Sequence, residues 1–381
     1  MSKQTTGAVL IVGGGIGAIQ AALDLANSGY YVYMVEKTPS IGGVMAQLDK
    51  TFPTNDCSMC IMSPKLVEVG RHINIKLLTL SEVEEVRGEK GNFEVSVFQK
   101  ARYVDMDKCI ACGACTEKCP KKVADVYNQK LIKRKAIYVP YPQAVPLKYA
   151  IDAKNCVKLT KNKCGNCEKT CPAGAINFAD TDKHLTLQVG SIILAPGFKT
   201  YDPSSKDLYG YNKNPDVVTS LEFERLLSAS GPNQGHLVRR SDHVEPKAIA
   251  WIQCVGSRDV NNCNNIHCSS VCCMYAIKQA IIAKEHDPKL ECTIFFMDMR
   301  THGKGFENCY NQAKDKYGIK FVRCRIHSVY GQSGENKGQI IDYVDEVSGQ
   351  WIRSVHDMVV LSVEWKYWRM SGCLPANWGL I

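Results

Sequence analysis

Nineteen cysteines make thiol chemistry the most prominent feature of this 381-residue sequence. Eight of them form two similar runs, CIACGACTEKCP with the spacing C-x2-C-x2-C-x3-C-P and CVKLTKNKCGNCEKTCP with the spacing C-x7-C-x2-C-x3-C-P. Loops of this kind wrap cubane [4Fe–4S] clusters, and in two-cluster ferredoxins the fourth cysteine of a run reaches the other cluster. The predicted ligand sets are Cys109, Cys112, Cys115 and Cys171 for one cluster and Cys119, Cys156, Cys164 and Cys167 for the other.

Two zinc sites are the alternative, because four thiolates also bind Zn2+. The prolines that follow each fourth cysteine, Pro120 and Pro172, and the duplication of the pattern favour iron–sulfur clusters. Such a pair of clusters forms a path for electrons. The segment 128–151 between the motifs is rich in Pro, Tyr and Lys, and it is either a docking loop for a partner or a solvated excursion.

A third group of cysteines lies in CSSVCCMYAIK, where Cys272 and Cys273 are adjacent. Neighbouring side chains of a strand point to opposite faces, so an adjacent pair that serves one site belongs at a loop-to-helix junction. With Cys254 and Cys268 the pair makes a four-thiolate set, for which we expect a third [4Fe–4S] cluster. Cys263 is a competing ligand, and buried or incidental cysteines are the alternative.

The first elements of the chain must hold a dinucleotide. AVLIVGGGIGAIQAALDLANSGYYVYMVEK reads as strand, glycine turn, helix and strand. In the pattern G-x-G-x-x-A, Gly13 permits the tight turn, Gly15 admits the pyrophosphate, and Ala18 allows close packing of the helix. Glu36 ends the second strand at the distance expected for a carboxylate that binds the adenosine ribose.

The glycines after this acid favour FAD over NAD, because Gly42 and Gly43 fit the flavin enzymes with two dinucleotide domains. The strand before Ala195-Pro196-Gly197 returns the chain to the flavin domain. Nearby, Cys57 and Cys60 form a C-x-x-C pair that is a redox dithiol, a ligand pair for a further cluster, or part of a pocket lining. The predicted cofactor-binding residues are Gly13, Gly15, Gly17, Ala18, Glu36, Lys37, Gly42, Gly43, Ala195 and Gly197.

The fold class that these patterns predict is α/β, with two Rossmann-type domains and an inserted α+β ferredoxin domain that carries two clusters. In the second Rossmann-like half, KAIAWIQCVGSRD replaces the G-x-G-x-x-G of a nicotinamide site, so we expect the third cluster there. The predicted boundaries are 1–101 for the first part of the flavin domain, 102–182 for the ferredoxin insertion, 183–245 for the flavin-domain continuation and linker, 246–363 for the second Rossmann-like domain, and 364–381 for an atypical tail.

Composition excludes several functions. The formal net charge is +9, but each [4Fe–4S] site with four thiolates carries about −2, so three clusters leave roughly +3. No arginine-rich tract indicates nucleic-acid binding. The absence of a run of about 18 apolar residues argues against a transmembrane segment. The start MSKQTTGAVLIVGGG lacks the zones of a signal peptide, so we expect a cytoplasmic protein.

The chain resembles the A subunit of heterodisulfide reductase, the flavin and iron–sulfur protein of methanogens with many bacterial relatives. The resemblance covers about residues 8–363. It rests on GGGIGAIQAALDLANSGY, IGGVMAQLDKTFPTNDCSMCIMSPKLVEVGRH, the two ferredoxin motifs, and QCVGSRD with CSSVCCMYAIKQA.

This resemblance implies a thioredoxin-reductase-like flavoprotein whose FAD splits the two electrons of a donor between a high-potential and a low-potential acceptor. The cluster that lies close to the flavin in the family maps onto the set of Cys254, Cys268, Cys272 and Cys273. A lysine near the flavin N5 maps onto Lys278, where a positive charge stabilises a reduced, anionic flavin; an ordinary surface lysine is the alternative.

The partners that the resemblance implies are the B and C subunits of heterodisulfide reductase, a hydrogenase or dehydrogenase protein that supplies electrons, and ferredoxin, all in a multi-subunit complex. The alternatives are an NAD(P)H-dependent ferredoxin or disulfide oxidoreductase, a flavin-free iron–sulfur relay protein, and a component that serves aromatic-ring reduction or sulfur metabolism. After MVVLSV the family closes the flavin domain, whereas this chain reads EWKYWRMSGCLPANWGLI, so we expect a truncated or frame-shifted end.

Overall fold

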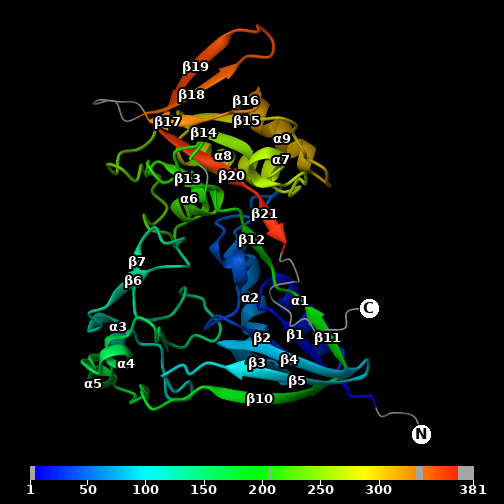
Figure 1. Cartoon of the computed structure of the whole chain (residues 1–381), viewed down its shortest axis with the longest axis vertical. Helices are drawn as coiled ribbons and strands as arrows, with labels where there is room; N and C mark the ends of the chain where they lie inside the picture. Colours follow the sequence, from blue (N-terminus) through cyan, green and yellow to red (C-terminus); the bar gives the residue numbers. More distant parts are fainter. Residues whose placement is uncertain (1–4, 206, 332–337, 368–381) are drawn as a thin grey trace. The chain divides into compact units, whose positions relative to one another are not determined.

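The computed structural model of the chain describes residues 5–205, 207–331 and 338–367 (Figure 1). Contacts divide these residues into two compact units. The first unit contains the described residues of 5–46 and 59–197, and the second contains those of 47–58 and 198–367. The sequence interpretation grouped residues 183–245 together, whereas the contacts place 198–245 in the second unit. The reason is a short strand, Val217–Thr219, that pairs within the sheet of the second unit.

A parallel sheet forms the centre of the first unit. Its strands lie in the order β11-β1-β2-β3, and every pairing is parallel. The apolar run AVLIV forms the second strand of this order because a strand covered on both faces needs apolar side chains on both. The bounds are β1 Ala8–Val12, β2 Tyr31–Glu36, β3 Ile75–Thr79 and β11 Ser191–Leu194.

Two helices of the first unit belong to the same apolar core as this sheet. Helix α1 (Ile16–Asn27) buries Ala18, Ala22 and Ala26, which recur every four residues and therefore lie on one face. Helix α2 (Ser58–Arg71) contributes apolar side chains to the same core. The predicted strand, glycine turn, helix and strand at the beginning of the chain are thereby confirmed.

A three-stranded antiparallel sheet in the order β10-β5-β4 completes the flavin-type part of the first unit. The insertion 102–182 follows β5 and precedes β10. These two strands are neighbours in the sheet, and Lys183 lies opposite Gln99. An insertion at this place leaves both sheets intact because its two ends lie on adjacent strands. The bounds are β4 Ser81–Glu89, β5 Asn92–Gln99 and β10 Lys183–Val189.

The insertion consists of short helices and strands (Figure 1). Six of the eight ferredoxin-type cysteines either belong to its apolar core or pack against that core. Ile137 and Ile151 are among the apolar residues of the same core. The helices are α3 Ala114–Glu117, α4 Val157–Lys161 and α5 Asn166–Thr170. The strands are β6 Lys122–Ala124, β7 Lys133–Lys135, β8 Ile137–Tyr138 and β9 Ala150–Ile151.

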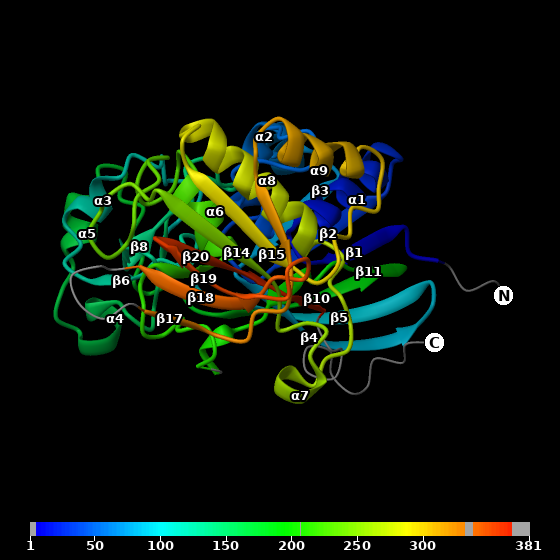
Figure 2. The same ribbon diagram turned by 90° about the horizontal axis from the view of Figure 1, so that it is seen from above.

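The second unit has a five-stranded parallel sheet in the order β13-β20-β14-β15-β16. Figure 2 shows α8 and α9 on one side of this sheet and the antiparallel strands β18 and β19 on the other. The strands are β13 Val217–Thr219, β14 Ala248–Val255, β15 Glu291–Phe296, β16 Lys320–Arg323 and β20 Met358–Val363. The helices are α6 Ser220–Leu227, α7 Val260–Cys263, α8 Cys272–His286 and α9 Phe306–Asp315.

Two smaller sheets complete the second unit. Strands β17 (Val329–Gly331), β18 (Gln339–Val344) and β19 (Trp351–His356) form an antiparallel sheet. Strands β12 (Phe198–Thr200) and β21 (Trp365–Tyr367) pair antiparallel, so the beginning of the expected tail is a strand of this unit. The rest of that tail, 368–381, lies outside the described residues. Among the described residues, none of the helices has the length and apolar character that crossing a membrane requires.

Candidate flavin and iron–sulfur sites

The turn between β1 and α1 is built so tightly that it requires glycine at its first position. Gly13 has a φ of +118°, and its backbone N–H donates to Val35 O at 2.8 Å. A Cβ at Gly13 would lie 2.1 Å from the carbonyl oxygen of Ala195, which is far inside van der Waals contact. The turn therefore passes directly against the segment that follows β11.

The second glycine pair lies on this turn. The backbone N–H of Gly42 donates to Gly14 O at 2.7 Å. A Cβ at Gly43 would lie 2.9 Å from the Cα of Gly15, so the two loops touch backbone to backbone. Gly15 is the N-cap of α1, and neither a capping side chain nor an acidic residue occupies the first turn. An uncapped helix N-terminus behind a glycine loop is suited to a pyrophosphate.

The predicted ribose ligand lies beside the same loop. Glu36 ends β2 and is 9% exposed. Its Oε1 accepts from the Thr38 N–H at 2.8 Å, and its Oε2 would be 2.8 Å from a Cβ placed on Gly14. The carboxylate is thus held next to the turn by its own loop, as a ribose-binding acid requires.

The remaining predicted cofactor-binding residues differ in how closely they approach this loop. The Ala195 N–H donates to Val12 O at 2.8 Å, and Gly197 has a φ of +73°. Ala18 is buried in the face of α1, where a larger side chain would separate the helix from the sheet. Gly17 and Lys37 are exposed, and a Cβ on Gly17 would meet no atom within 4 Å. The fit to a dinucleotide therefore rests on the glycine turn and Glu36.

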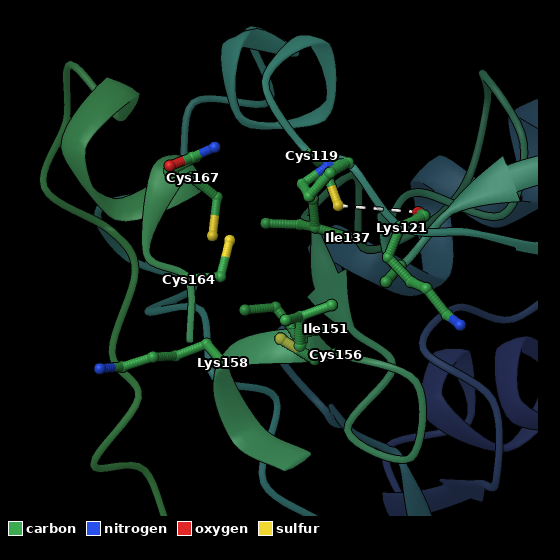
Figure 3. A pocket seen from close by; sticks show the side chains of 12 residues that line it. Cys119, Lys121, Ile137, Ile151, Cys156, Lys158, Cys164 and Cys167 are labelled. Atoms are coloured by element: carbon green, nitrogen blue, oxygen red, sulfur yellow. Dashed lines mark hydrogen bonds between the residues drawn. The ribbon is translucent and has the colours of Figure 1, made fainter. Parts of the chain in front are cut away.

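Four cysteines from both ferredoxin motifs line one pocket of the insertion. Cys119, from the first motif, joins Cys156, Cys164 and Cys167 of the second. Figure 3 shows the sulfur atoms of Cys164 and Cys167 pointing toward each other, with Ile137 extending toward the same space. The pocket wall is otherwise mainly apolar, as in the surroundings of a buried cluster.

A second pocket has the complementary set. Cys109, Cys112 and Cys115 of the first motif line it together with Cys171 of the second. Each fourth cysteine therefore lies with the three cysteines of the other motif, which is the crossed arrangement expected of two-cluster ferredoxins. Among the described residues, no three His, Cys, Asp or Glu side chains are close enough to hold a single metal ion.

Burial dominates the acid–base properties of the innermost thiols. It raises the pKa of Cys115 to about 12 and that of Cys167 to about 11, and neighbouring thiols add to the effect. These thiols are therefore protonated at neutral pH while no cluster is bound. Binding of a cluster requires thiolates and so releases protons.

The four cysteines of the third predicted set lie close together in the second unit. Cys254 is at the irregular end of β14 with a φ of +62°, and Cys272 and Cys273 form the beginning of α8. Cys254 interacts electrostatically with Cys268, Cys272 and Cys273. The adjacent cysteines are thus both in the first turn of the helix, directly after the loop, as their predicted place at a loop-to-helix junction requires.

Cys263, the competing candidate, has a different neighbour. Its Sγ lies 3.4 Å from the Tyr201 hydroxyl, and both side chains belong to the apolar core of the second unit. Within the third set, the Ser269 hydroxyl lies 2.6 Å from the Cys272 Sγ. Burial raises the pKa of Cys272 to about 12 and that of Cys273 to about 11.

Arg258 is a residue of this site that the sequence interpretation missed. Its guanidinium pairs with Asp298, Nη2 to Oδ2 at 2.7 Å, while its Nη1 is buried without a hydrogen-bond partner among the described atoms. Burial raises the pKa of the Cys254 thiol, and the adjacent Arg258 guanidinium opposes this effect. The signal in the sequence was the arginine of CVGSRD, four residues after Cys254.

Lys278 is buried at 1% exposure, which excludes the alternative of a surface lysine. Its Nζ lies 2.6 Å from Glu224 Oε1 and donates to Lys50 O at 2.8 Å. Glu224 also accepts from the Asp49 N–H at 3.0 Å and from the Gln279 amide at 2.7 Å. This network joins α6 and α8 to the segment Gln47–Ser58, and sequence reasoning did not identify Glu224.

The C-x-x-C pair lies where the chain passes from the second compact unit to the first, after residue 58. Cys57 and Cys60 are both disulfide-bonded and both exposed, at the beginning of α2. A role as cluster ligands needs the reduced thiols, and the redox-dithiol and pocket-lining interpretations stay predictions.

The glycine turn and the paired cysteine pockets define a flavin- and iron–sulfur-type oxidoreductase, and comparison with known proteins supports this class. Residues 8–59 match the family model of FAD dependent oxidoreductases. Residues 108–175 match the 4Fe-4S dicluster domain, which contains both crossed cysteine sets. The prediction of iron–sulfur clusters over zinc in the insertion is thereby confirmed.

Curated relatives align over nearly the whole chain. The iron-sulfur A subunit of CoB–CoM heterodisulfide reductase from Methanocaldococcus jannaschii is 47% identical over 353 residues, which are 93% of this chain and 53% of the relative. A second such A subunit, from Methanopyrus kandleri, is 49% identical over 94% of this chain and 54% of the relative. The A subunit of the ferredoxin:CoB-CoM heterodisulfide reductase of Methanosarcina mazei is 40% identical over 95% of this chain and 44% of the relative.

Over these shared residues the chain belongs to the family of heterodisulfide reductase A subunits, as its motifs predicted. It spans about half the length of the curated relatives it matches. Among solved structures, thioredoxin reductase from T. acidophilum matches 94% of this chain and 76% of that chain with a TM-score of 0.46 and 12% identity. Thioredoxin reductase from Lactococcus lactis matches 94% of this chain and 77% of that chain, with the same TM-score of 0.46 and 10% identity.

Proposed function

We propose that this protein is the FAD- and [4Fe–4S]-dependent electron-transfer component of a heterodisulfide-reductase-type complex in the cytoplasm. The observation that carries the proposal is the crossed pairing of the two cysteine motifs around two pockets, in an insertion between neighbouring strands of a flavin-type domain. Two adjacent clusters joined to a dinucleotide site form a chain of redox centres rather than a hydrolytic or transfer site.

At the flavin site, FAD supplies the conversion between two-electron and one-electron transfer when it is bound. The α1 N-terminus and the turn at Gly13 and Gly15 hold the pyrophosphate, and Glu36 accepts from the ribose hydroxyls. Gly42 and Gly43 support the turn from outside. From the family resemblance we assign Lys278 to charge compensation of the reduced flavin, a role in which it would exchange its present partner Glu224 for the flavin.

At the iron–sulfur sites, each crossed set of four cysteines ligates one cluster, and the thiolates form as protons leave the buried thiols. The set of Cys254, Cys268, Cys272 and Cys273 ligates a third. Support for this third cluster comes from the mutual electrostatic contacts of the four thiols and from the separate contact of Cys263 with Tyr201.

In the complex, we assign electron bifurcation between a two-electron donor, ferredoxin and a disulfide-type acceptor to this protein. The partners would be the B and C subunits of such a complex, a hydrogenase or dehydrogenase protein, and ferredoxin. One relative is named as the A subunit of an H(2):CoB-CoM heterodisulfide,ferredoxin reductase and another as that of a ferredoxin:CoB-CoM heterodisulfide reductase. The disulfide chemistry itself would take place on a partner protein.

Iron and flavin content per chain after anaerobic purification tests the proposal. We expect about twelve irons and one FAD, because three cubanes hold four irons each. About eight irons would remove the third cluster. Twelve irons without flavin would favour a flavin-free relay protein, and rapid bleaching of the flavin by NADH without partners would favour an NAD(P)H-dependent reductase.

A further inference from the structure

The positive charge of this chain is concentrated in one part of the ferredoxin insertion. The segment 118–171 contains twelve lysines and one arginine against two aspartates and one glutamate, a net charge of +10. The whole chain has a formal net charge of +9, so the rest of it is close to neutral. A local excess of this size creates a potential that acts beyond pairwise contacts.

Most of these lysines face solvent. Nine of the twelve are exposed. Across the described residues of segment 118–171 there is one ion pair, between Arg134 and Asp152 at 3.4 Å. Exposed cations that repel one another without counter-charges destabilise the compact state, so folding does not account for their concentration here.

The charge surrounds one of the two cysteine pockets. Lys121 and Lys158 line the pocket of Cys119, Cys156, Cys164 and Cys167. Figure 3 shows the Lys158 side chain extending away from that pocket. Six more lysines, all exposed, lie within three residues of a cysteine of this pocket, namely Lys118, Lys122, Lys154, Lys161, Lys163 and Lys169.

The other pocket differs in this respect. It is lined by the set of Cys109, Cys112, Cys115 and Cys171 and by uncharged residues only. Its own sequence neighbourhood, 104–117, contains two aspartates, one glutamate and one lysine. One lysine does approach this pocket, since the Lys148 Nζ donates to Cys109 O at 2.6 Å. The excess of exposed lysines is therefore larger around the Cys119 pocket, although the two ligand sets are alike.

We propose that the lysine surface around the Cys119 pocket, formed by Lys118, Lys121, Lys154, Lys161, Lys163 and Lys169, docks an acidic one-electron carrier protein. This inference rests on the proposed function, because it requires a cluster in that pocket. Lysines act as point charges on flexible stems, which suits a transient encounter, while stable recognition of phosphates favours arginine. Electron-transfer complexes have small, weak interfaces whose formation is steered by charge.

The electron step needs no bond formation. One electron passes from the reduced carrier to the oxidised cluster of the Cys119 pocket, so the carrier is oxidised and the cluster reduced by one unit. The reverse direction uses the same surface. Docking over this pocket makes its cluster, and not the one ligated by Cys109, the point of exchange with the carrier.

The test measures electron transfer between the anaerobically purified, cluster-loaded chain and an acidic [4Fe–4S] ferredoxin by stopped flow. The variant combines Lys121→Glu, Lys161→Glu and Lys163→Glu. We expect its second-order rate constant at low salt to fall at least about tenfold, because steering contributes factors of that size. The wild-type rate should fall steeply as salt rises, and the rate of the variant should depend on salt weakly.

The matched control combines Lys76→Glu, Lys90→Glu and Lys183→Glu, three exposed lysines of the same unit outside the insertion. It changes the net charge equally, and we expect a rate within about twofold of wild type. Iron content and the electron paramagnetic resonance spectrum, measured on each protein first, establish that its clusters are present.

The outcomes distinguish a failure of the docking proposal from a failure of the proposed electron-transfer function. Equal rates for the two triple variants, in proteins that retain their clusters, would overturn the docking surface alone. A wild-type chain without iron in this pocket would overturn the proposed function and the docking with it. Binding of double-stranded DNA that the lysine variant loses, with unchanged ferredoxin rates, would assign the surface to nucleic acid and overturn the proposal.

Discussion

At Gly13 a single added methyl group should largely abolish flavin binding and leave cluster binding intact. In Gly13→Ala the new Cβ would collide with the Ala195 carbonyl oxygen, 2.1 Å away, and the φ of +118° disfavours any side chain. We expect bound flavin to fall below about a tenth of wild type, because a displaced turn loses its backbone contacts with the pyrophosphate. Flavin released from the purified protein, per chain, measures the effect.

Gly7→Ala, just before β1, is the control for this change, because a Cβ there meets no atom within 4 Å. It should keep its flavin. The iron content of both variants should equal that of wild type, since the insertion is not touched. A Gly13→Ala protein with a full complement of flavin would show that this turn does not hold the cofactor.

Arg258 should set the potential of the third cluster. Its guanidinium lies beside Cys254 and places a positive charge next to a site that becomes more negative on reduction. Removing that charge in Arg258→Gln should lower the midpoint potential by about 50–100 mV, since a unit charge several ångströms away is worth a few kcal/mol. Redox titration followed by electron paramagnetic resonance measures the shift.

The control for Arg258 is Arg323→Gln, which breaks an exposed ion pair with Glu346 in the same unit. It should leave the potential unchanged, and Arg258→Lys should recover part of the wild-type value. If Arg258→Gln and wild type have the same midpoint potential, the guanidinium does not act on the cluster.

At the scale of elements, the crossing of the two cysteine motifs has a spectroscopic consequence. Cys119 belongs to the first motif but lines the pocket of the second. Cys119→Ser and Cys164→Ser should therefore perturb the same cluster signal, whereas Cys171→Ser and Cys112→Ser should perturb the other. Electron paramagnetic resonance of the four reduced variants distinguishes the pairs. An uncrossed arrangement would instead group Cys119 with Cys112.

At the scale of the whole molecule, the second unit should be less stable in acid because of a buried histidine. Burial lowers the pKa of His356 from 6.5 to about 4, against the opposing charges of Asp357 and Glu291. Between these pH values the unfolded chain binds a proton that the folded unit does not, so the free energy of unfolding falls as pH drops. The loss reaches about 3 kcal/mol near pH 4.

His356→Phe should remove this part of the pH dependence, because it leaves no group to protonate. His184→Gln, at an exposed position of β10 in the first unit, is the control and should leave the acid transition of the second unit unchanged. Denaturant titrations at several pH values, followed for each unfolding transition, measure both. An unchanged slope with pH in His356→Phe would contradict the assignment.

The sequence by itself determined the chemistry of this protein and much of its fold. The spacing of the cysteines, the glycine turn and the acid at the end of β2 are local patterns, and their chemistry follows from short-range geometry. For the same reason β1, α1, β2 and the ferredoxin insertion were predictable from residues close in sequence. The apolar run before Ala195 also marked β11, which returns the chain to the first sheet.

Only the tertiary structure decided which distant residues meet. The contact of Cys263 with Tyr201, the burial of Lys278 against Glu224, and the guanidinium of Arg258 beside Cys254 all depend on how the chain packs. The assignment of residues 198–245 to the second unit depends on the pairing of β13 with β20, more than a hundred residues later. Such contacts are set by packing and by sheet register, which local patterns do not specify.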